Sequence, residues 1–319
     1  MFNLHMGPKK EAVNYDVIYD FIALGLGPAG LNAGLYASRK GLKTLIVGHE
    51  LGGQLKNTTE VDNYLGFPVV DAAQLIVNFK THLDSLNVPI LTDVLVTLIK
   101  KDKNVFLLDL NNGKTLKSKT LLYALGGSPR KLNVPGEHLL AGKGLSYCVT
   151  CDGPFYAGKD IVVAGGGNSA IDAAKDLARI AKSVTVIQRS VLRADQKSVD
   201  KLLENQHVKI ILNTTILEVV GSEKVEGVRI LDKTTGAESI YPTDALFIEI
   251  GNIPNTALLT DLVKLNDVGE VFVNARQETS LEGLYAAGDI TSNSHRQIII
   301  AAGDGAKAAL EAANYLNQQ

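Results

Sequence analysis

The chain of 319 residues is 45% hydrophobic and 21% charged, which is typical of a globular protein with a sizeable core and excludes a disordered chain. Its 32 Lys and Arg residues nearly balance its 34 Asp and Glu residues, giving a net charge of −2, and the charges are scattered along the chain. This balance removes the electrostatic basis for binding nucleic acid, and the length favours two domains over one.

The first stretch of the chain, M-F-N-L-H-M-G-P-K-K-E, lacks the apolar segment of a signal peptide. Apolar runs elsewhere are interrupted by Asp, Lys or Gly well before the roughly 18 residues that a membrane-spanning helix needs. We therefore expect a cytoplasmic protein without a membrane partner.

Residues 19–39 predict a strand, a glycine turn and a helix, with the sequence Y-D-F-I-A-L-G-L-G-P-A-G-L-N-A-G-L-Y-A-S-R. The turn contains Gly25, Gly27 and Gly30, and T-L-I-V at 44–47 supplies a second strand. In such a turn the first glycine permits the tight bend, the second lets the backbone approach a pyrophosphate, and the third packs helix on strand. The phosphates then lie at a helix N-terminus, so the pattern is typical of a dinucleotide site.

A hairpin and an apolar strand follow this first unit. F-L-L-D-L-N-N-G-K-T-L-K (106–117) places a polar turn between two strand-like runs, and L-L-Y-A-L-G-G-S-P-R (121–130) is a strand that ends in glycine. We interpret the second of these as the border of a domain.

The only two cysteines are Cys148 and Cys151, in G-L-S-Y-C-V-T-C-D-G-P. In a cytosolic chain, where thiols are kept reduced, a C-x-x-C pair indicates redox chemistry or metal binding. Zinc needs four ligands, and the histidines show no partner spacing at positions 5, 49, 82, 138, 207 and 295. A structural alternative is that the cysteines are two small buried hydrophobes. The redox interpretation is favoured because an aspartate adjoins the pair and two nucleotide units flank it.

Residues 159–179 repeat the strand, turn and helix as K-D-I-V-V-A-G-G-G-N-S-A-I-D-A-A-K-D-L-A-R, with Gly165, Gly167 and Ala170 at the matching places. V-T-V-I at 184–187 is the second strand, and a hairpin follows in V-R-I-L-D-K-T-T-G-A-E-S-I. One glycine turn is a weak signal, whereas two in one chain strongly indicate two dinucleotide-binding domains.

The predicted fold is therefore α/β, with two Rossmann-like, three-layer domains, the second inserted into the first. A-L-F-I-E-I-G-N-I-P-N-T (245–256) is the second border strand. The predicted domains are residues 1–130 with 251–319, for FAD, and residues 131–250, which resemble a pyridine-nucleotide domain and carry the C-x-x-C pair.

The motifs G-L-G-P-A-G, G-G-Q-L, Y-C-V-T-C-D-G, G-G-G-N-S-A and L-Y-A-A-G-D, in that order, resemble the low-molecular-weight thioredoxin reductases over essentially the whole chain. The resemblance implies a homodimeric FAD enzyme that reduces thioredoxin or a thioredoxin-like protein. It further implies FAD contacts at the first glycine turn, beside the flavin and along the ribityl chain. Dinucleotide sites usually have an acidic ribose partner about 20 residues after the first glycine; Gly48 occupies the strand end here, so Glu50 is the candidate. These residues are Gly25, Gly27, Pro28, Ala29, Gly30, Glu50, Gln54, Asn63, Asp289, Arg296, Gln297 and Ala301.

The resemblance also implies roles for the redox residues. Cys151 is the thiol nearest the flavin, Cys148 attacks the substrate disulfide, and Asp152 is the acid–base group. Such a division agrees with thiol chemistry, because only a thiolate attacks a disulfide and a second thiol must resolve the mixed intermediate.

The chain departs from the family beyond the second glycine turn. NADPH-dependent members read H-R-R-x-x-x-R there, whereas this chain reads V-I-Q-R-S-V-L-R-A, so Gln188 and Ser190 replace a histidine and an arginine. The expected contacts for NADPH or NADH are Gly165, Gly167, Asn168, Ser169, Ala170, Arg189 and Arg193. Leu125 also replaces the usual threonine of an A-T-G segment, with an effect that we expect to be local.

Other functions stay open at this point. The donor of electrons is a nicotinamide nucleotide or another reductant such as ferredoxin, and the flavin and disulfide are alternatively a redox sensor without turnover. A ferredoxin–NAD(P) reductase of the same architecture is disfavoured because such proteins lack the C-x-x-C pair.

Overall fold

The computed structural model describes residues 13–58, 60–292 and 295–319. The stretch that was predicted to lack the apolar segment of a signal peptide, residues 1–11, therefore lies outside the described residues. The chain divides into two compact units, Met1–Ser128 with Ile253–Gln319, and Pro129–Asn252. In the part of the chain that is described, no helix is long and apolar enough to cross a membrane.

The first unit is built on a seven-stranded sheet in the order β5-β2-β1-β8-β7-β6, with β19 also paired to β8. The strands β5, β2, β1, β8 and β19 are parallel, and β7 and β6 continue the sheet as an antiparallel meander. Their bounds are β1 Ile18–Leu24, β2 Thr44–Val47, β5 Ile90–Leu91, β6 Val96–Asp102, β7 Val105–Leu110, β8 Thr115–Tyr123 and β19 Leu284–Ala286.

The long strand β8 joins the two parts of this sheet. Its first half pairs with β7, as Phe106 with Ser118 shows, while its second half pairs with β19, as Leu284 with Leu121 shows. The same strand therefore brings residues from the far end of the sequence into this sheet, with β8 itself lying between β19 and β1.

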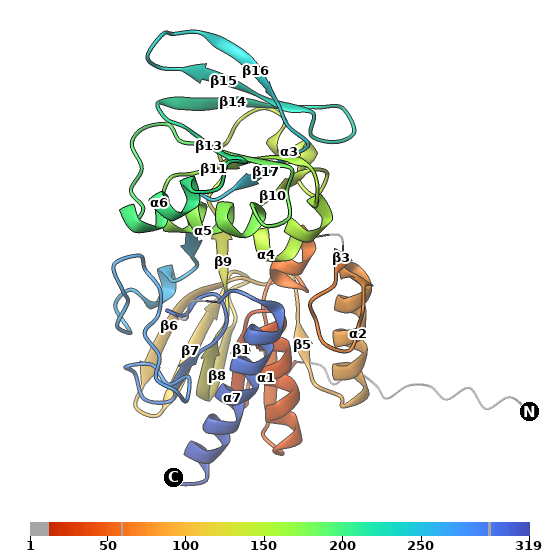
Figure 1. Ribbon diagram of the computed structural model, residues 1–319. Coiled ribbons are helices and arrows are strands. Elements are labelled where there is room, and N and C mark those ends of the chain that lie inside the picture. The colour runs from red at the N-terminus through yellow and green to blue at the C-terminus, as the bar shows by residue number, and fades with distance from the viewer. Residues whose placement is uncertain (1–12, 59, 293–294) are drawn as a thin grey trace, which may run out of the picture. The chain divides into compact units, whose positions relative to one another are not determined.

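Helices and short segments complete the first unit (Figure 1). α1 starts at Pro28, which suits the first helical position because its fixed φ is helical and its missing N–H is not needed there. The bounds are α1 Pro28–Arg39, α2 Ala72–Ser85, α7 Ile298–Leu316, η1 Gly53–Asn57, η3 Ala257–Leu259, β3 Glu60–Val61 and β4 Val70–Asp71. The chain passes between the units through β9 (Gly127–Pro129) and β18 (Asn252–Pro254).

Both faces of the first sheet are buried. Ile22 and Leu24 of β1 lie in one apolar cluster with the meander strands, and Phe21 and Ala23 lie in another with α1, α2 and α7. Alternation along a strand places successive side chains on opposite faces, so an uninterrupted apolar strand indicates a layer on each side.

The second unit contains a parallel sheet of five strands in the order β10-β17-β11-β12-β13, and a separate meander of β14, β15 and β16. Its strands are β10 Leu145–Ser146, β11 Asp160–Ala164, β12 Ser183–Ile187, β13 Val208–Ile211, β14 Thr214–Val220, β15 Gly227–Asp232, β16 Glu238–Pro242 and β17 Ala245–Ile248. Its helices are α3 Glu137–Leu140, α4 Val149–Asp152, η2 Gly153–Tyr156, α5 Asn168–Leu177 and α6 Gln196–Leu203.

This second sheet is also covered on both faces. Ile161 and Val163 of β11 pack with α5 and α6, while Val162 and Ala164 face the meander through Ile216. The predicted α/β class with two Rossmann-like units is thereby confirmed. Both predicted hairpin turns are present, with Gly113 at φ 80° and Gly236 at φ 75°.

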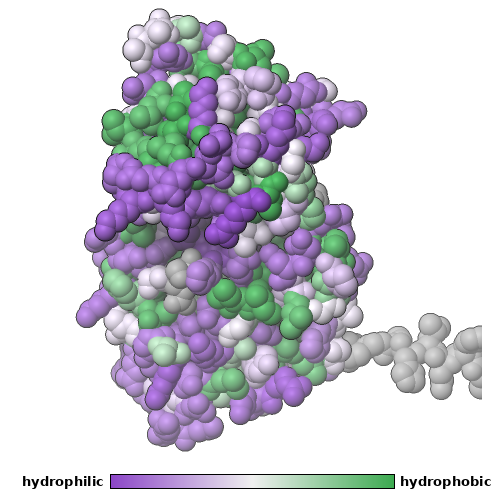
Figure 2. Space-filling view, in the orientation of Figure 1, coloured by the Kyte–Doolittle hydropathy of each residue, from purple (hydrophilic) through white to green (hydrophobic). Residues whose placement is uncertain are grey.

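The surface agrees with the scattered charges of the sequence. Figure 2 shows hydrophilic and hydrophobic residues interspersed over much of the visible face. The surface ion pairs include Lys80 with Asp84, within one helix, and Lys119 with Asp20, between two strands. We expect each to contribute less than about 1 kcal/mol to stability.

The contact between α1 and α7 predicts a sharp difference between two glycines of one helix. A Cβ at Gly305 would lie 2.0 Å from the Ala29 carbonyl oxygen, whereas a Cβ at Gly303 would meet nothing within 4 Å. We expect Gly305→Ala to lower the free energy of unfolding by about 1 to 3 kcal/mol. Gly303→Ala should be neutral or stabilising by up to about 1 kcal/mol. Urea unfolding monitored by circular dichroism measures both, and equal midpoints would contradict the proposed close packing.

Candidate active site

The first glycine turn follows β1 and has no room for side chains at two positions. Gly25 has φ 130°, and a Cβ there would lie 2.2 Å from the Ala124 carbonyl oxygen. A Cβ at Gly30 would lie 2.0 Å from the carbonyl oxygen of Gly25. The turn is therefore pressed against the end of β8 and the start of α1, and only glycine fits at both positions.

The segment G-G-Q-L lies directly on this turn. The Gly52 amide donates to the Leu26 carbonyl at 2.8 Å, and a Cβ at Gly53 would lie 3.0 Å from the Gly27 Cα. Two glycine backbones thus approach each other, which places Gln54 beside the turn. The Gln54 side chain donates to the Gly127 carbonyl.

The N-terminus of α1 faces the same place. Gly27 is the N-cap, has an extended backbone, and supplies no side chain to cap the helix. Pro28, Ala29 and Gly30 form the first turn. Pro28 has no N–H, but the backbone amides of Ala29 and Gly30 and the positive dipole end favour an anion. This part of the structure is therefore suited to a pyrophosphate.

The segment after β19 brings Asp289 to the turn. Gly288, at φ 75°, fits between two helices, because a Cβ there would lie 3.2 Å from the Cβ atoms of both Ala29 and Ala301. Asp289 is half-buried, and burial raises the pKa of its carboxyl; Arg296 acts in the opposite direction. No hydrogen bond or ion pair joins the Asp289 side chain to another described residue, so this carboxylate is an acceptor that a bound hydroxyl would satisfy.

Of the remaining residues predicted around the flavin, Asn63 and Gln297 are in contact, whereas Arg296 is paired with another residue. Asn63 Nδ2 donates to Gln297 Oε1 at 3.3 Å, although the two residues are 234 positions apart. Gln297 is the N-cap of α7, and Ala301 is buried in its first turn. Arg296 is exposed and forms an ion pair with Glu270.

Glu50, the candidate ribose partner, is exposed three residues after β2 and forms an ion pair with Lys56. The Lys56 ammonium lowers the pKa of this carboxyl. A ribose hydroxyl bound by Glu50 would therefore share the carboxylate with Lys56.

These features fit FAD. The bare backbone of Gly27 and the start of α1 suit its pyrophosphate, and the unpartnered Asp289 suits a hydroxyl of its sugar chain. All the residues concerned belong to the first unit.

The second glycine turn repeats the geometry of the first. Gly165 has φ 147°, and a Cβ there would lie 2.3 Å from the Glu249 carbonyl oxygen. Gly167 is open, since a Cβ would meet nothing within 4 Å, and Asn168 and Ser169 are exposed at the start of α5. Ala170 is buried against the turn. A second pyrophosphate has room to approach the backbone here.

The loop after β12 is folded back on that turn. Gln188 is buried, accepts from the Arg189 amide at 3.1 Å and donates to the Val191 carbonyl at 3.1 Å. Its side chain covers Gly166, where a Cβ would lie 2.6 Å from Gln188 Cδ. Arg193 donates its backbone amide to the Gly166 carbonyl at 2.7 Å. The loop is thus held close to the glycine turn, and the Arg189 and Arg193 side chains are exposed.

The two cysteines form a disulfide, Cys148–Cys151, with their Cα atoms 5.3 Å apart. Cys148 is the N-cap of α4, and its Sγ accepts a hydrogen bond from the Cys151 amide at 3.2 Å. A donor aimed at this sulfur favours its thiolate form once the disulfide is reduced. Within the described residues, no group of three or more His, Cys, Asp or Glu residues could hold a metal ion.

Ser146 connects this disulfide to Asp152, a contact that the sequence analysis did not identify. The Ser146 hydroxyl donates to Asp152 Oδ2 at 2.5 Å and accepts from the Cys148 amide at 3.0 Å. Ser146 is buried at the end of β10, opposite Phe247 of β17. A hydroxyl residue two positions before the first cysteine was the only signal in the sequence.

A family model described as pyridine nucleotide-disulphide oxidoreductase matches residues 19–305 of the chain. The alkyl hydroperoxide reductase of Staphylococcus aureus (strain MSSA476) has a subunit that is 40% identical over 299 residues, which cover 93% of this chain and 59% of that relative. The chain therefore spans about three fifths of the length of the curated relatives that it matches.

Two solved structures are similar over nearly their whole length. A thioredoxin reductase from Streptococcus pyogenes MGAS5005 has a TM-score of 0.91 and 33% identity, covering 95% of this chain and 99% of the other. A thioredoxin reductase from T. acidophilum has a TM-score of 0.63 and 38% identity, covering 94% and 98%.

The unpartnered carboxylate of Asp289 predicts that FAD binding depends on it. We expect Asp289→Ala to weaken FAD binding by about tenfold or more, the effect of losing one hydrogen bond to a charged group. The ratio of flavin absorbance to protein in purified samples, and titration of flavin-stripped protein with FAD, measure this loss. Asp261→Ala removes an exposed carboxylate of the same unit and is the control; equal FAD affinity in both variants would refute the role of Asp289.

Proposed function

Because the chain belongs to the pyridine nucleotide-disulphide oxidoreductase family, we propose that it is an FAD-dependent disulfide reductase acting on thioredoxin or a thioredoxin-like protein. The resemblance of the sequence motifs to thioredoxin reductases agrees with this family and with the similarity to two solved thioredoxin reductases. The observation that carries the proposed activity is the Cys148–Cys151 disulfide next to the hydrogen-bonded pair Ser146 and Asp152. FAD, when bound, supplies the two electrons that open this disulfide.

The reduced cysteine pair then exchanges with the substrate. The Cys148 thiolate attacks one sulfur of the substrate disulfide, so that a mixed disulfide forms and the other substrate sulfur leaves as a thiolate. Cys151 next attacks the Cys148 sulfur, which restores the Cys148–Cys151 disulfide and releases the second substrate thiol. Overall, the substrate gains two electrons and two protons, and the enzyme dithiol loses the same two electrons and two protons.

Asp152 handles the proton in this proposal. A carboxyl held beside the pair by Ser146 protonates the departing thiolate and takes a proton from the attacking thiol. Ser146 fixes the position of this carboxyl because the same hydroxyl is also bound by the Cys148 backbone.

The proposed division of labour places FAD in residues 1–130 with 251–319 and the nicotinamide nucleotide in residues 131–250. The open backbone of Gly167 and the exposed Arg189 and Arg193 support NADPH or NADH as donor. We further propose a cytoplasmic homodimer. Reduction of the flavin by ferredoxin alone would replace the donor assignment, and a flavin that is reduced without turnover would favour a redox sensor.

The proposed relay predicts that both cysteines are essential. Cys148→Ser and Cys151→Ser should each lower thioredoxin reduction at least about a thousandfold, since neither serine can form the disulfide. The flavin should still be reduced by the donor, because electron entry precedes exchange.

Stopped-flow absorbance of the flavin and a coupled thioredoxin assay separate these two steps. Thr150→Ser, a change at the exposed residue between the cysteines, is the control and should keep normal turnover. Near-normal turnover in either cysteine variant would rule out the relay.

The loop after β12 predicts weak discrimination between the nucleotides. Ser190 stands where an arginine would bind the 2′-phosphate, so we expect NADPH to be favoured over NADH by less than about a hundredfold in kcat/KM. Ser190→Arg should raise that ratio. Steady-state kinetics with both nucleotides measure it, and a wild-type preference of several thousandfold would show that other residues complete the phosphate site.

A further inference from the structure

Three segments that are distant in sequence are hydrogen-bonded to one another at the carboxyl edge of the second unit's sheet. They are the end of β12, the end of β13 and the turn between β15 and β16. The Gln188 amide donates to the Ile211 carbonyl at 2.9 Å, and the Lys233 amide donates to the Asn213 carbonyl at 2.9 Å. The turn between β15 and β16 is thereby attached where β12 and β13 end. In open α/β sheets, ligands bind at this carboxyl edge.

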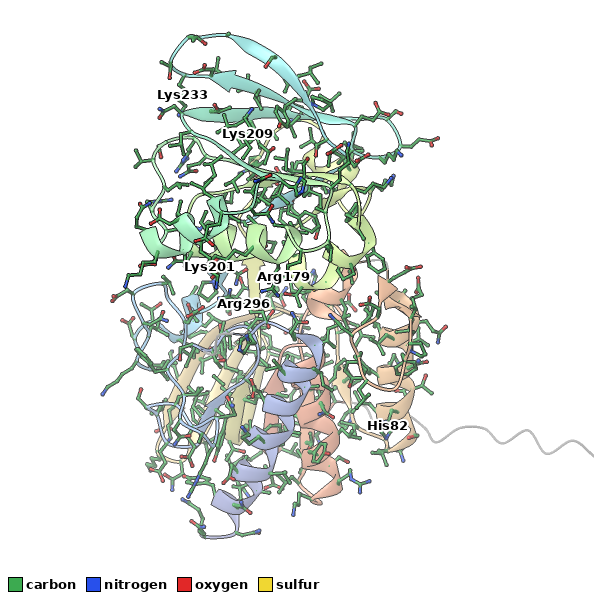
Figure 3. All side chains as sticks on the ribbon, viewed as in Figure 1. His82, Arg179, Lys201, Lys209, Lys233 and Arg296 are labelled. Atoms are coloured by element: carbon green, nitrogen blue, oxygen red, sulfur yellow. A yellow bond between two sulfur atoms is a disulfide. The ribbon has the colours of Figure 1, made fainter. Side chains whose placement is uncertain are left out.

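The Lys233 side chain is turned toward the loop after β12. Its Nζ donates to the Arg189 carbonyl at 3.1 Å, and Figure 3 labels Lys233 at the β15–β16 turn. An ammonium group carries three N–H donors, so one bond to Arg189 leaves two donors for another acceptor. The ammonium of Lys233 consequently adjoins the strand-end position where an adenine ribose is recognised.

The positive charge at this edge is not neutralised. No ion pair within the described ranges includes Arg189, Arg193 or Lys233. Three carboxylates of the meander that carries Lys233 have other partners. Asp232 accepts from the Thr234 amide, and Glu218 and Glu238 both bind Arg229.

We propose that Lys233 is a specificity-determining residue of the nucleotide site, where it binds the 2′-phosphate of NADPH together with Arg189 and Arg193. The inference rests on the proposed function, since it concerns the donor. Lys233 supplies, from a turn 44 residues further along the chain than Arg189, the cation that Ser190 does not. Most of the remaining preference for NADPH over NADH then depends on Lys233.

Nucleotide binding tests this without any turnover. The oxidised holoenzyme is titrated calorimetrically with 2′,5′-ADP, which carries the 2′-phosphate, and with 5′-AMP, which lacks it. Lys233→Gln should weaken 2′,5′-ADP binding about tenfold, the effect of one lost charge-assisted contact, and change 5′-AMP binding less than about twofold. Lys233→Arg should restore most of the difference.

Lys209→Gln is the matched control, because Lys209 is an exposed lysine on β13 of the same unit (Figure 3). The proposal is overturned if Lys233→Gln weakens 2′,5′-ADP no more than Lys209→Gln does, or weakens both ligands equally. Failure of wild type to bind either ligand would overturn it together with the nicotinamide donor. The disulfide reductase proposal would then be judged separately, by turnover of thioredoxin with reduced ferredoxin as the donor.

Discussion

Contact between backbones at the two glycine turns is the constraint on which both units depend. At Gly25 and at Gly165 a single added Cβ would lie 2.2 to 2.3 Å from a carbonyl oxygen of a neighbouring strand end. The positive φ of both residues excludes most side chains in any case. Because each turn is this tight, a strand ends and a helix begins within a few residues. The helix N-terminus then opens directly at the edge of the sheet, where it favours phosphate.

Small residues extend this close packing through the first unit. Gly288 fits between Ala29 and Ala301, and Gly305 lies against the Ala29 carbonyl. These contacts let a helix from the end of the chain cover the helix that follows the first turn. Asp289 thereby reaches the turn although it is 264 positions from Gly25. A cofactor site is assembled from two distant segments because their backbones can touch.

The redox pair is organised by local contacts instead. Ser146, Cys148, Cys151 and Asp152 lie within seven consecutive residues and are joined by hydrogen bonds of 2.5 to 3.2 Å. The pairing of β10 with β17 fixes the start of this segment. The attacking thiol, the resolving thiol and the carboxyl are therefore held together by contacts within one short segment. This arrangement suits a reaction that passes through a covalent intermediate.

The sequence alone determined both glycine turns, the strands at 44–47 and 184–187, the hairpin turns and the cysteine pair, because each is encoded in fewer than about twenty consecutive residues by periodicity and turn chemistry. Only the tertiary structure decided which distant side chains meet. Asn63 reaches Gln297, Gln188 folds over Gly166 rather than outward, and Lys233 reaches Arg189. Such contacts depend on which strands pair, in what register and where the following loops are fastened. No local pattern of residues carries that information.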